Sequence, residues 1–302
     1  MQAGRFVAAI LAAALLTTAA PVHAQQQQPA PPPAPATDPL LGQFGAIVEV
    51  APPPPEAARL ANLLNTSLSS LEPQRRRRQD VYLVVASLWD DPVFEREAVQ
   101  AEAILRQHLG AEGRSIILSA GGQGQRQYPA ATPTNISATI GHVASIMDPN
   151  EDLFVLFVTS HGTSNGAISL RERGRLDASL RPISLSAMLS QANIRNRVVI
   201  LSACFAGAFV PPLQNPDTIV LAAAATDRTS FGCEPQRDWT YFGDAYFNRA
   251  LREGASMLEG FERAKTQIST WETEQHLTPS NPQSAIGANA AAMLGRAERE
   301  AH

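Results

Sequence analysis

The chain has 302 residues, of which 44% are hydrophobic, enough to build one sizeable α/β core. Its formal net charge of −4 disfavours binding to the phosphate backbone of nucleic acids as its main activity. It has only two cysteines, Cys204 and Cys233, so a disulfide framework does not hold the fold together. The alternative interpretation is that Cys204 and Cys233 form a single disulfide bridge in an oxidising compartment.

The N-terminus has the pattern of a secretory signal peptide. Residues 1–24 contain one basic residue, Arg5, then an apolar stretch, and end in small residues that flank a cleavage site. The apolar stretch is too short for a membrane-spanning helix, and no later run is long enough either. The pattern predicts an exported protein, periplasmic or extracellular, without stable membrane insertion. Removal of the segment takes away Arg5 and no acid, so the formal charge changes from −4 to −5.

A linker and a single domain are predicted to follow. Residues 25–55 are rich in Gln and Pro and cannot bury enough apolar surface to fold, so a disordered linker is expected. Residues 56–302 are predicted to form one domain with its core at about 81–290. Its first helix is expected over 56–71, where leucines recur at helical spacing. The arginine run at 75–78 is interpreted as a solvated segment; the alternative is a surface contact or a processing site.

Apolar runs alternate with helical patterns through the domain. Continuous apolar runs bounded by turn residues are typical of parallel strands buried on both faces. Strands are predicted over 81–86, 115–118, 152–160, 198–201 and 218–225. Helices are predicted over 94–109, 135–147, 184–194, 240–251, 256–270 and 285–294. The alternation favours an α/β fold, a three-layer α/β/α sandwich around a mostly parallel sheet.

Some finer expectations follow from the same patterns. In the helix over 94–109, the residues expected to face the core are Val99, Ala103, Ile104 and Leu105. Ser184 is expected to cap the helix that begins there. The glycine cluster at 121–124 lacks the lysine of a phosphate-binding loop and is interpreted as a turn. The chain has no Cys-x-x-Cys pair and no His-Glu-x-x-His motif, so no metal site is predicted.

Two of the predicted strands end in reactive residues. The strand over 152–160 runs into His161, and the strand over 198–201 runs into Cys204 three residues after its end. In an open α/β sheet the ligand crevice lies outside the carboxyl ends of the strands, so we expect the imidazole and the thiol to meet there. A thiolate is a good nucleophile, and an imidazole can take its proton and later protonate a departing amine.

The glycine after the histidine has its own predicted role. Gly162 has no Cβ, so its backbone can come close to a substrate carbonyl group. The N–H groups of Gly162 and Cys204 are therefore expected to form an oxyanion hole, which contributes on the order of a few kcal/mol for each donor.

The residues around these positions resemble a known family. Residues 159–162 (Thr-Ser-His-Gly) and 202–207 (Ser-Ala-Cys-Phe-Ala-Gly) look like the His-Gly and Ala-Cys motifs of the legumain-like cysteine peptidases, peptidase family C13 of the caspase–gingipain clan. The resemblance covers about 81–290 and includes residues 224–233 and 241–244. It implies a caspase-like α/β/α sandwich, a His–Cys dyad, peptide or protein substrates, and no cofactor or metal.

The resemblance also implies roles for individual residues. His161 resembles the general base and Cys204 the nucleophile. Arg96 and Asp244 are similar to residues that line the pocket for the side chain before the scissile bond, and Ser230 would lie on its wall. The alternative is that Arg96 is a solvated arginine on a helix, Asp244 an acid at a helix N-terminus and Ser230 an ordinary loop serine.

The sequence departs from the legumain pattern at three places. Ser202 stands where legumains place a pocket glutamate, Ser160 where they often have an aspartate, and the segment around Phe94 has no asparagine to orient the histidine. The dyad is unaffected, but strict specificity for asparagine is not expected. A pocket holding Asp244 would suit a polar amide or a basic side chain equally well.

Together these features predict an exported cysteine endopeptidase that hydrolyses peptide bonds through a thioester on Cys204. Cleavage after Asn or another polar residue fits the resemblance. One alternative is a transpeptidase or ligase that passes the same thioester to an amine. The other is a catalytically inactive envelope protein that binds peptides, in which Cys233 oxidises Cys204.

Overall fold

A six-stranded sheet is the centre of the fold in the computed structural model, which describes residues 45–121 and 126–301. The strand order is β3-β2-β4-β7-β8-β9. Their bounds are β2 (Val81–Ser87), β3 (Ser115–Ser119), β4 (Leu153–Thr159), β7 (Arg197–Ser202), β8 (Thr218–Ala222) and β9 (Gln283–Ile286). All neighbours pair in parallel except β8 and β9, which are antiparallel. The predicted mostly parallel sheet is confirmed.

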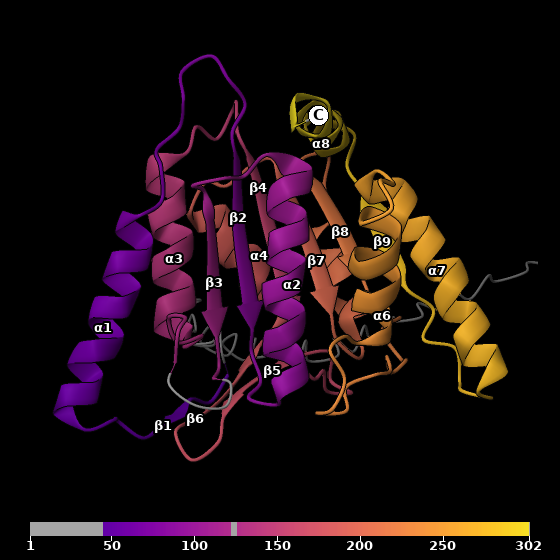
Figure 1. The fold of residues 1–302 in the computed structure, drawn as a ribbon, viewed down its shortest axis with the longest axis horizontal. Helices are drawn as coiled ribbons and strands as arrows, with labels where there is room; N and C mark the ends of the chain where they lie inside the picture. The colour runs from indigo at the N-terminus through magenta and orange to yellow at the C-terminus, as the bar shows by residue number, and fades with distance from the viewer. Residues whose placement is uncertain (1–44, 122–125, 302) are drawn as a thin grey trace, which may run out of the picture. The chain divides into compact units, whose positions relative to one another are not determined.

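Helices cover both faces of this sheet, because its strands are apolar on both sides. In β4, Phe154 and Leu156 belong to one core cluster, whereas Val155 and Phe157 belong to the other. The first cluster is covered by α3 (Pro133–Ile146), α4 (Pro182–Gln191) and α5 (Val210–Leu213), with α1 (Pro54–Ser69) against α3. The second is covered by α2 (Pro92–Leu109), the π-helix η2 (Asp244–Leu251), α7 (Met257–Glu274) and α8 (Ala288–Ala301). Figure 1 shows α2 in front of the sheet and α4 behind it, so the predicted three-layer sandwich is confirmed.

A second, smaller sheet lies at the edge where the parallel strands end (Figure 1). Its strand order is β1 (Val48–Glu49), β6 (Leu176–Leu180) and β5 (Ile168–Glu172), all antiparallel. The β5–β6 hairpin was not among the predicted strands, although its buried apolar residues alternate with polar ones. β5 begins nine residues after β4 ends at Thr159, so the hairpin stays close to the edge at which β4 ends.

The structure corrects several local expectations. Ala103 is exposed rather than in the core, and the buried face of α2 is formed by Phe94, Ala98, Ala101, Leu105 and others. Ser184 does not cap α4, because Pro182 starts the helix and Arg181 is its N-cap residue. The helix predicted over 240–251 is a short α6 (Tyr241–Gly243) that continues as the π-helix η2.

The N-terminal predictions fall largely outside the described residues. The expected signal peptide, 1–24, and the first part of the expected linker are not described. The part of the linker that is described, 45–55, contains β1 and the first residues of α1, which starts at Pro54. No helix in the two described ranges is long and apolar enough to cross a membrane.

The arginine run is only partly a solvated segment. Arg75 binds the carboxylate of Asp80 with its backbone N–H and its guanidinium, at 2.5–2.8 Å. Asp80 is fully buried and also lies 3.6 Å from Nε of Arg114. The first arginine of the run therefore stabilises a buried carboxylate just before β2.

Candidate active site

The two predicted reactive residues lie side by side at the carboxyl edge of the sheet. β4 and β7 are parallel neighbours, and Thr159 pairs with Ser202 at their ends. His161 and Cys204 each follow two residues later, and both side chains are partly exposed, that of His161 by 34%. No hydrogen bond joins the His161 ring to Sγ of Cys204 in the described part of the chain.

The backbone of Gly162 is packed against that of Cys204. A Cβ built on Gly162 would lie 1.8 Å from the Cys204 carbonyl oxygen, so no other residue fits there without a shift of the backbone. Among the described residues, neither the N–H of Gly162 nor that of Cys204 donates to a protein acceptor. Phe205, directly after Cys204, has a left-handed backbone with φ of 59°, which is uncommon for a residue with a side chain.

The loop after β8 covers the thiol. The backbone N–H of Ser230 lies 3.3 Å from Sγ of Cys204, and the Ser230 hydroxyl lies 3.7 Å from it. Cys233, three residues further on, is a free thiol, as is Cys204. Burial raises the pKa of the Cys233 thiol well above its usual range, and a charge on Cys204 would raise it further. Of the two thiols, Cys204 is the one placed for chemistry.

His161 has a carboxylate and two aromatic rings around it. Nε2 of His161 lies 3.5 Å from Oδ2 of Asp91, and the indole N–H of Trp89 donates to the same oxygen at 3.1 Å. The rings of Trp89 and Phe94 both meet the imidazole edge to face, with centroids 4.9 Å away. These contacts fix the plane of the imidazole between α2 and β4.

A buried glutamate lies beneath both strand ends. Glu97 on α2 is fully buried, and the hydroxyl groups of Thr159 and Thr240 donate to its carboxylate. The Ser202 hydroxyl lies 3.0 Å from that of Thr240, so the network reaches β7 as well. Burial raises the pKa of Glu97 to about 7, against the lowering effect of these hydroxyl donors. Glu97 thus joins the end of β4 to the end of β7 through side chains alone.

The remaining residues that the resemblance assigned to a pocket are spread over different surroundings. Ser202 is 2% exposed and belongs to the Glu97 network. The Arg96 guanidinium binds the carbonyl oxygens of Pro235 and Arg237. Asp244, in η2, accepts hydrogen bonds within its own helix from Asn248 and Arg249. Only Ser230 contacts the thiol in the described structure, and no ion pair joins Arg96 to Asp244 there.

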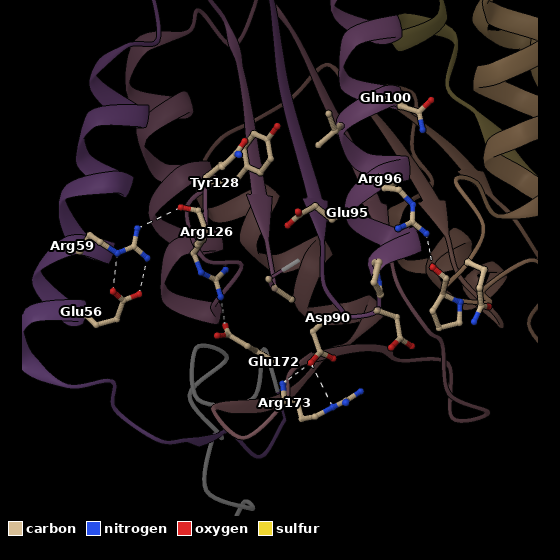
Figure 2. A pocket seen from close by; sticks show the side chains of 18 residues that line it. Glu56, Arg59, Asp90, Glu95, Arg96, Gln100, Arg126, Tyr128, Glu172 and Arg173 are labelled. Atoms are coloured by element: carbon tan, nitrogen blue, oxygen red, sulfur yellow. Dashed lines mark hydrogen bonds and ion pairs between the residues drawn. The ribbon is translucent and has the colours of Figure 1, made fainter. Parts of the chain in front are cut away.

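A cavity of about 1460 Å³ lies along α2, next to the site (Figure 2). Asp91, whose carboxylate faces His161, forms part of its wall. Further along the same helix, Glu95 and Val99 line the cavity, and Tyr128 faces them from the segment after β3. The cavity is therefore continuous with the wall of the candidate active site.

Two residues of the site were missed by sequence reasoning. Asp91 carries a usable signal, since it follows β2 at the same sheet edge and precedes the proline that starts α2. Glu97 carries none, because a glutamate inside a helix is normally exposed and its hydroxyl partners come from distant segments. In the described ranges, no group of three or more His, Cys, Asp or Glu side chains is arranged to hold a metal ion.

Comparisons with known proteins agree with the fold and the motifs. A search of curated protein sequences finds no match. Among solved structures, caspase-1 from Spodoptera frugiperda superimposes with a TM-score of 0.50 at 11% sequence identity, covering 72% of this chain and 94% of the caspase. That likeness concerns the fold alone. The model of the peptidase C13 family matches residues 123–292, more than half of the chain. The chain therefore belongs to the peptidase C13 family, the legumain-like cysteine peptidases.

Proposed function

We propose that this protein is an exported cysteine endopeptidase in which Cys204 is the nucleophile and His161 the general base. The Cys204 thiol gives its proton to the His161 imidazole, and the sulfur adds to the carbonyl carbon of the scissile peptide bond. The N–H groups of Gly162 and Cys204 bind the oxyanion of the resulting tetrahedral intermediate. The imidazolium then protonates the departing amine. Water, activated by His161, hydrolyses the thioester and restores the thiol.

One observation carries this proposal. Two backbone N–H groups without a protein acceptor, those of Gly162 and Cys204, lie beside a partly exposed thiol, at the sheet edge that also presents an imidazole. A structural cysteine at a strand end needs neither the free donors nor the close glycine contact. This arrangement supports the proposed roles of a nucleophile, a base and an oxyanion hole at one site.

The substrate side of the proposal rests on fewer contacts. Ser230 lies against the Cys204 sulfur, which supports a place for it on the wall of the pocket for the residue before the scissile bond. Asp244 and Arg96 remain candidates for the same pocket from the family resemblance. The proposal that the protein is exported rests on the signal-peptide pattern of residues 1–24. Mass spectrometry of the N-terminal peptide of protein purified from its native host tests whether this segment is removed.

The test is cleavage of a peptide library by the wild-type chain, Cys204→Ala and Cys233→Ala. The proposal predicts that Cys204→Ala abolishes cleavage at an unchanged fold, verified by circular dichroism. Cys233→Ala is the matched control, because Cys233 is the other free thiol, its pKa is raised by burial, and it plays no part in the mechanism. Cleavage by Cys204→Ala at the wild-type rate would refute the proposal.

A competing amine separates hydrolysis from transpeptidation. Both reactions pass through the same Cys204 thioester, and they differ only in whether water or an amine receives the acyl group. The library is therefore digested with and without a glycyl peptide in excess. We expect the hydrolysed acid as the main product; a ligated product in excess over the acid assigns the transpeptidase alternative instead.

A further inference from the structure

The cavity beside the active site has a wall that continues from the catalytic histidine. Asp91, the N-cap residue of α2, and Glu95 and Val99 within the helix are spaced four residues apart and line the same side of the cavity. Asp91 faces His161 and Glu95 lies one helical turn, about 6 Å, further along. A polypeptide whose scissile bond lies at Cys204 would pass this face of α2 within a few residues.

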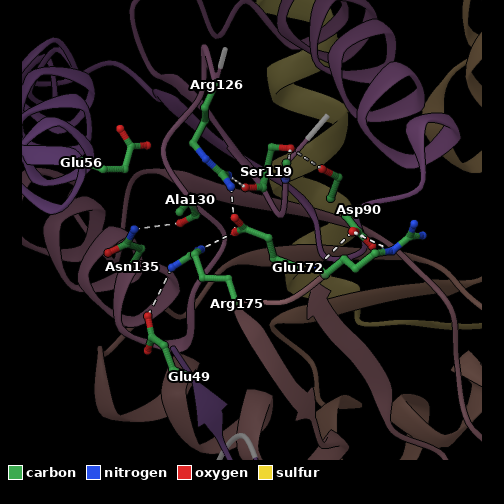
Figure 3. A network of polar contacts seen from close by, with 12 residues as sticks. Glu49, Glu56, Asp90, Ser119, Arg126, Ala130, Asn135, Glu172 and Arg175 are labelled. Atoms are coloured by element: carbon green, nitrogen blue, oxygen red, sulfur yellow. Dashed lines mark hydrogen bonds and ion pairs between the residues drawn. The ribbon is translucent and has the colours of Figure 1, made fainter. Parts of the chain in front are cut away.

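The arginines of the cavity are already neutralised. Each of the four has a carboxylate partner, in the pairs Arg59–Glu56 at 2.7 Å, Arg96–Asp238 at 3.1 Å, Arg126–Glu172 at 2.7 Å and Arg173–Asp90 at 3.9 Å. The best buried of these, Arg126, is held in the network of Figure 3, where Arg175 also binds Glu172 and reaches Glu49. Each pair reduces the positive charge that the cavity offers to an acidic side chain.

Glu95 is the carboxylate that stays uncompensated. Among the described residues it forms no ion pair, and its one hydrogen-bond donor is the Ser119 hydroxyl. Figure 2 shows its carboxylate pointing into the cavity from α2. Asp91 also forms no ion pair with an arginine or lysine among the described residues, but its carboxylate is directed to His161. Glu95 is therefore the group of the cavity that lacks a positive partner.

An aromatic ring faces Glu95 across the cavity. Tyr128 lines the cavity, and burial together with the nearby charge of Glu95 raises the pKa of its phenol. A carboxylate and an aromatic ring on opposite walls suit a long side chain with a cationic end, because the ring covers the stem and attracts the charge. Lysine and arginine are the residues with such side chains.

We infer that this cavity is a substrate subsite for a basic side chain, with Glu95 as the residue that selects it. The inference rests on the proposed peptidase function and adds to it the class of residue preferred near the scissile bond. Arg96, which the family resemblance assigns to the pocket before the scissile bond, also lines this cavity, but the group that selects a basic side chain here is Glu95.

A binding experiment tests the inference without catalysis. Two pools of fluorescent decapeptides are compared on the Cys204→Ala chain, identical except that one carries arginine where the other carries the neutral isostere citrulline. The expected result is about tenfold tighter binding of the arginine pool, as for one charge-assisted contact. Glu95→Gln should remove this difference and Glu95→Lys should reverse it. Glu253→Gln is the matched control, because Glu253 is exposed and lies outside the cavity.

Cleavage-site mapping on the active chain gives the second readout. The wild-type chain should cut the arginine pool about tenfold faster than the citrulline pool, and Glu95→Gln should cut both pools equally. Equal binding and equal cleavage of the two pools by chains that retain Glu95 overturn the inference. If no chain cleaves either pool but Glu95-dependent arginine binding persists, the peptidase proposal fails and the basic subsite stands. If cleavage depends on Cys204 but the preference does not depend on Glu95, only the subsite fails.

Discussion

Gly162 and Cys204 are in such close backbone contact that a Cβ on Gly162 would lie 1.8 Å from the Cys204 carbonyl oxygen and 3.2 Å from its Cα. The two residues follow neighbouring parallel strands, so this contact sets how closely the ends of β4 and β7 approach each other. The glycine is therefore a geometric requirement of the site.

Gly162→Ala should separate the two strand ends. Because the clash is with backbone atoms, which cannot move as a flexible side chain does, we expect a loss of about 2 kcal/mol in the free energy of unfolding and near-complete loss of peptidase activity. Urea unfolding and cleavage rates measure the two effects. Gly141→Ala on α3 is the control, since a Cβ there meets nothing within 4 Å and both quantities should be maintained. Full activity in Gly162→Ala would show that the contact is not required.

Glu97 should make stability depend on pH. Its pKa is raised from 4.5 to about 7 in the folded chain, so between these pH values the unfolded chain loses a proton that the folded chain keeps. The free energy of unfolding contributed by Glu97 is therefore greatest below pH 4.5 and decreases as pH rises to 7, by up to about 3 kcal/mol. Glu97→Gln lacks this dependence.

The measurement is urea unfolding of both chains from pH 4.5 to 8. The stability of Glu97→Gln relative to the wild type should increase with pH up to about 7 and then level off. Asp152, whose pKa burial raises to about 6, contributes equally in both chains and cancels. If the difference in the free energy of unfolding between the two chains were constant from pH 4.5 to 8, Glu97 would be ionised throughout that range.

Asp91 should act by positioning the His161 ring. Its carboxylate is 3.5 Å from Nε2 and does not reach the thiol, so we expect Asp91→Ala to lower kcat by about tenfold and to change KM little. Asp91→Asn keeps an acceptor for the Trp89 N–H and should recover part of the loss. Steady-state kinetics of the two variants check this; an unchanged kcat in Asp91→Ala would exclude the positioning role.

Arg75 should matter for stability and not for activity. It provides three of the hydrogen bonds to the fully buried Asp80 carboxylate, two of them from its side chain. Arg75→Ala removes those two, and we expect a loss of about 1–3 kcal/mol in the free energy of unfolding. Arg76→Ala, at an exposed neighbour of the same charge, should have no measurable effect. If the two substitutions lowered the free energy of unfolding equally, the contact between Arg75 and Asp80 would not contribute to stability.

The central strands could be predicted because burial on both faces leaves a continuous apolar run. This held for β2, β4, β7 and β8, and the same reasoning placed His161 and Cys204 at one edge of the sheet. β9 could not be predicted in this way, because it is a short edge strand whose residues are half-buried or exposed. The β5–β6 hairpin has no continuous apolar run, because its buried apolar residues alternate with polar ones on short strands.

The surroundings of the dyad were less accessible to sequence reasoning. The position of Glu97 depends on hydroxyl groups more than 60 residues away along the chain, such as that of Thr159. The inward face of α2 was predicted only in part, since Leu105 is buried and Ile104 packs against the core, but Ala103 is exposed. Helical spacing predicts that a face exists, but the sheet and its partners decide which residues occupy it.

The central claim is that peptide bonds are cleaved through an acyl group on the sulfur of Cys204. Acid quenching within the first turnover of an activated peptide ester, followed by mass spectrometry of the digested protein, detects such a thioester directly. The account predicts the acyl mass on the Cys204 peptide of the wild-type chain, its absence from the Cys233 peptide, and slower formation in His161→Ala. Turnover of the ester with no acyl mass on Cys204 would contradict it.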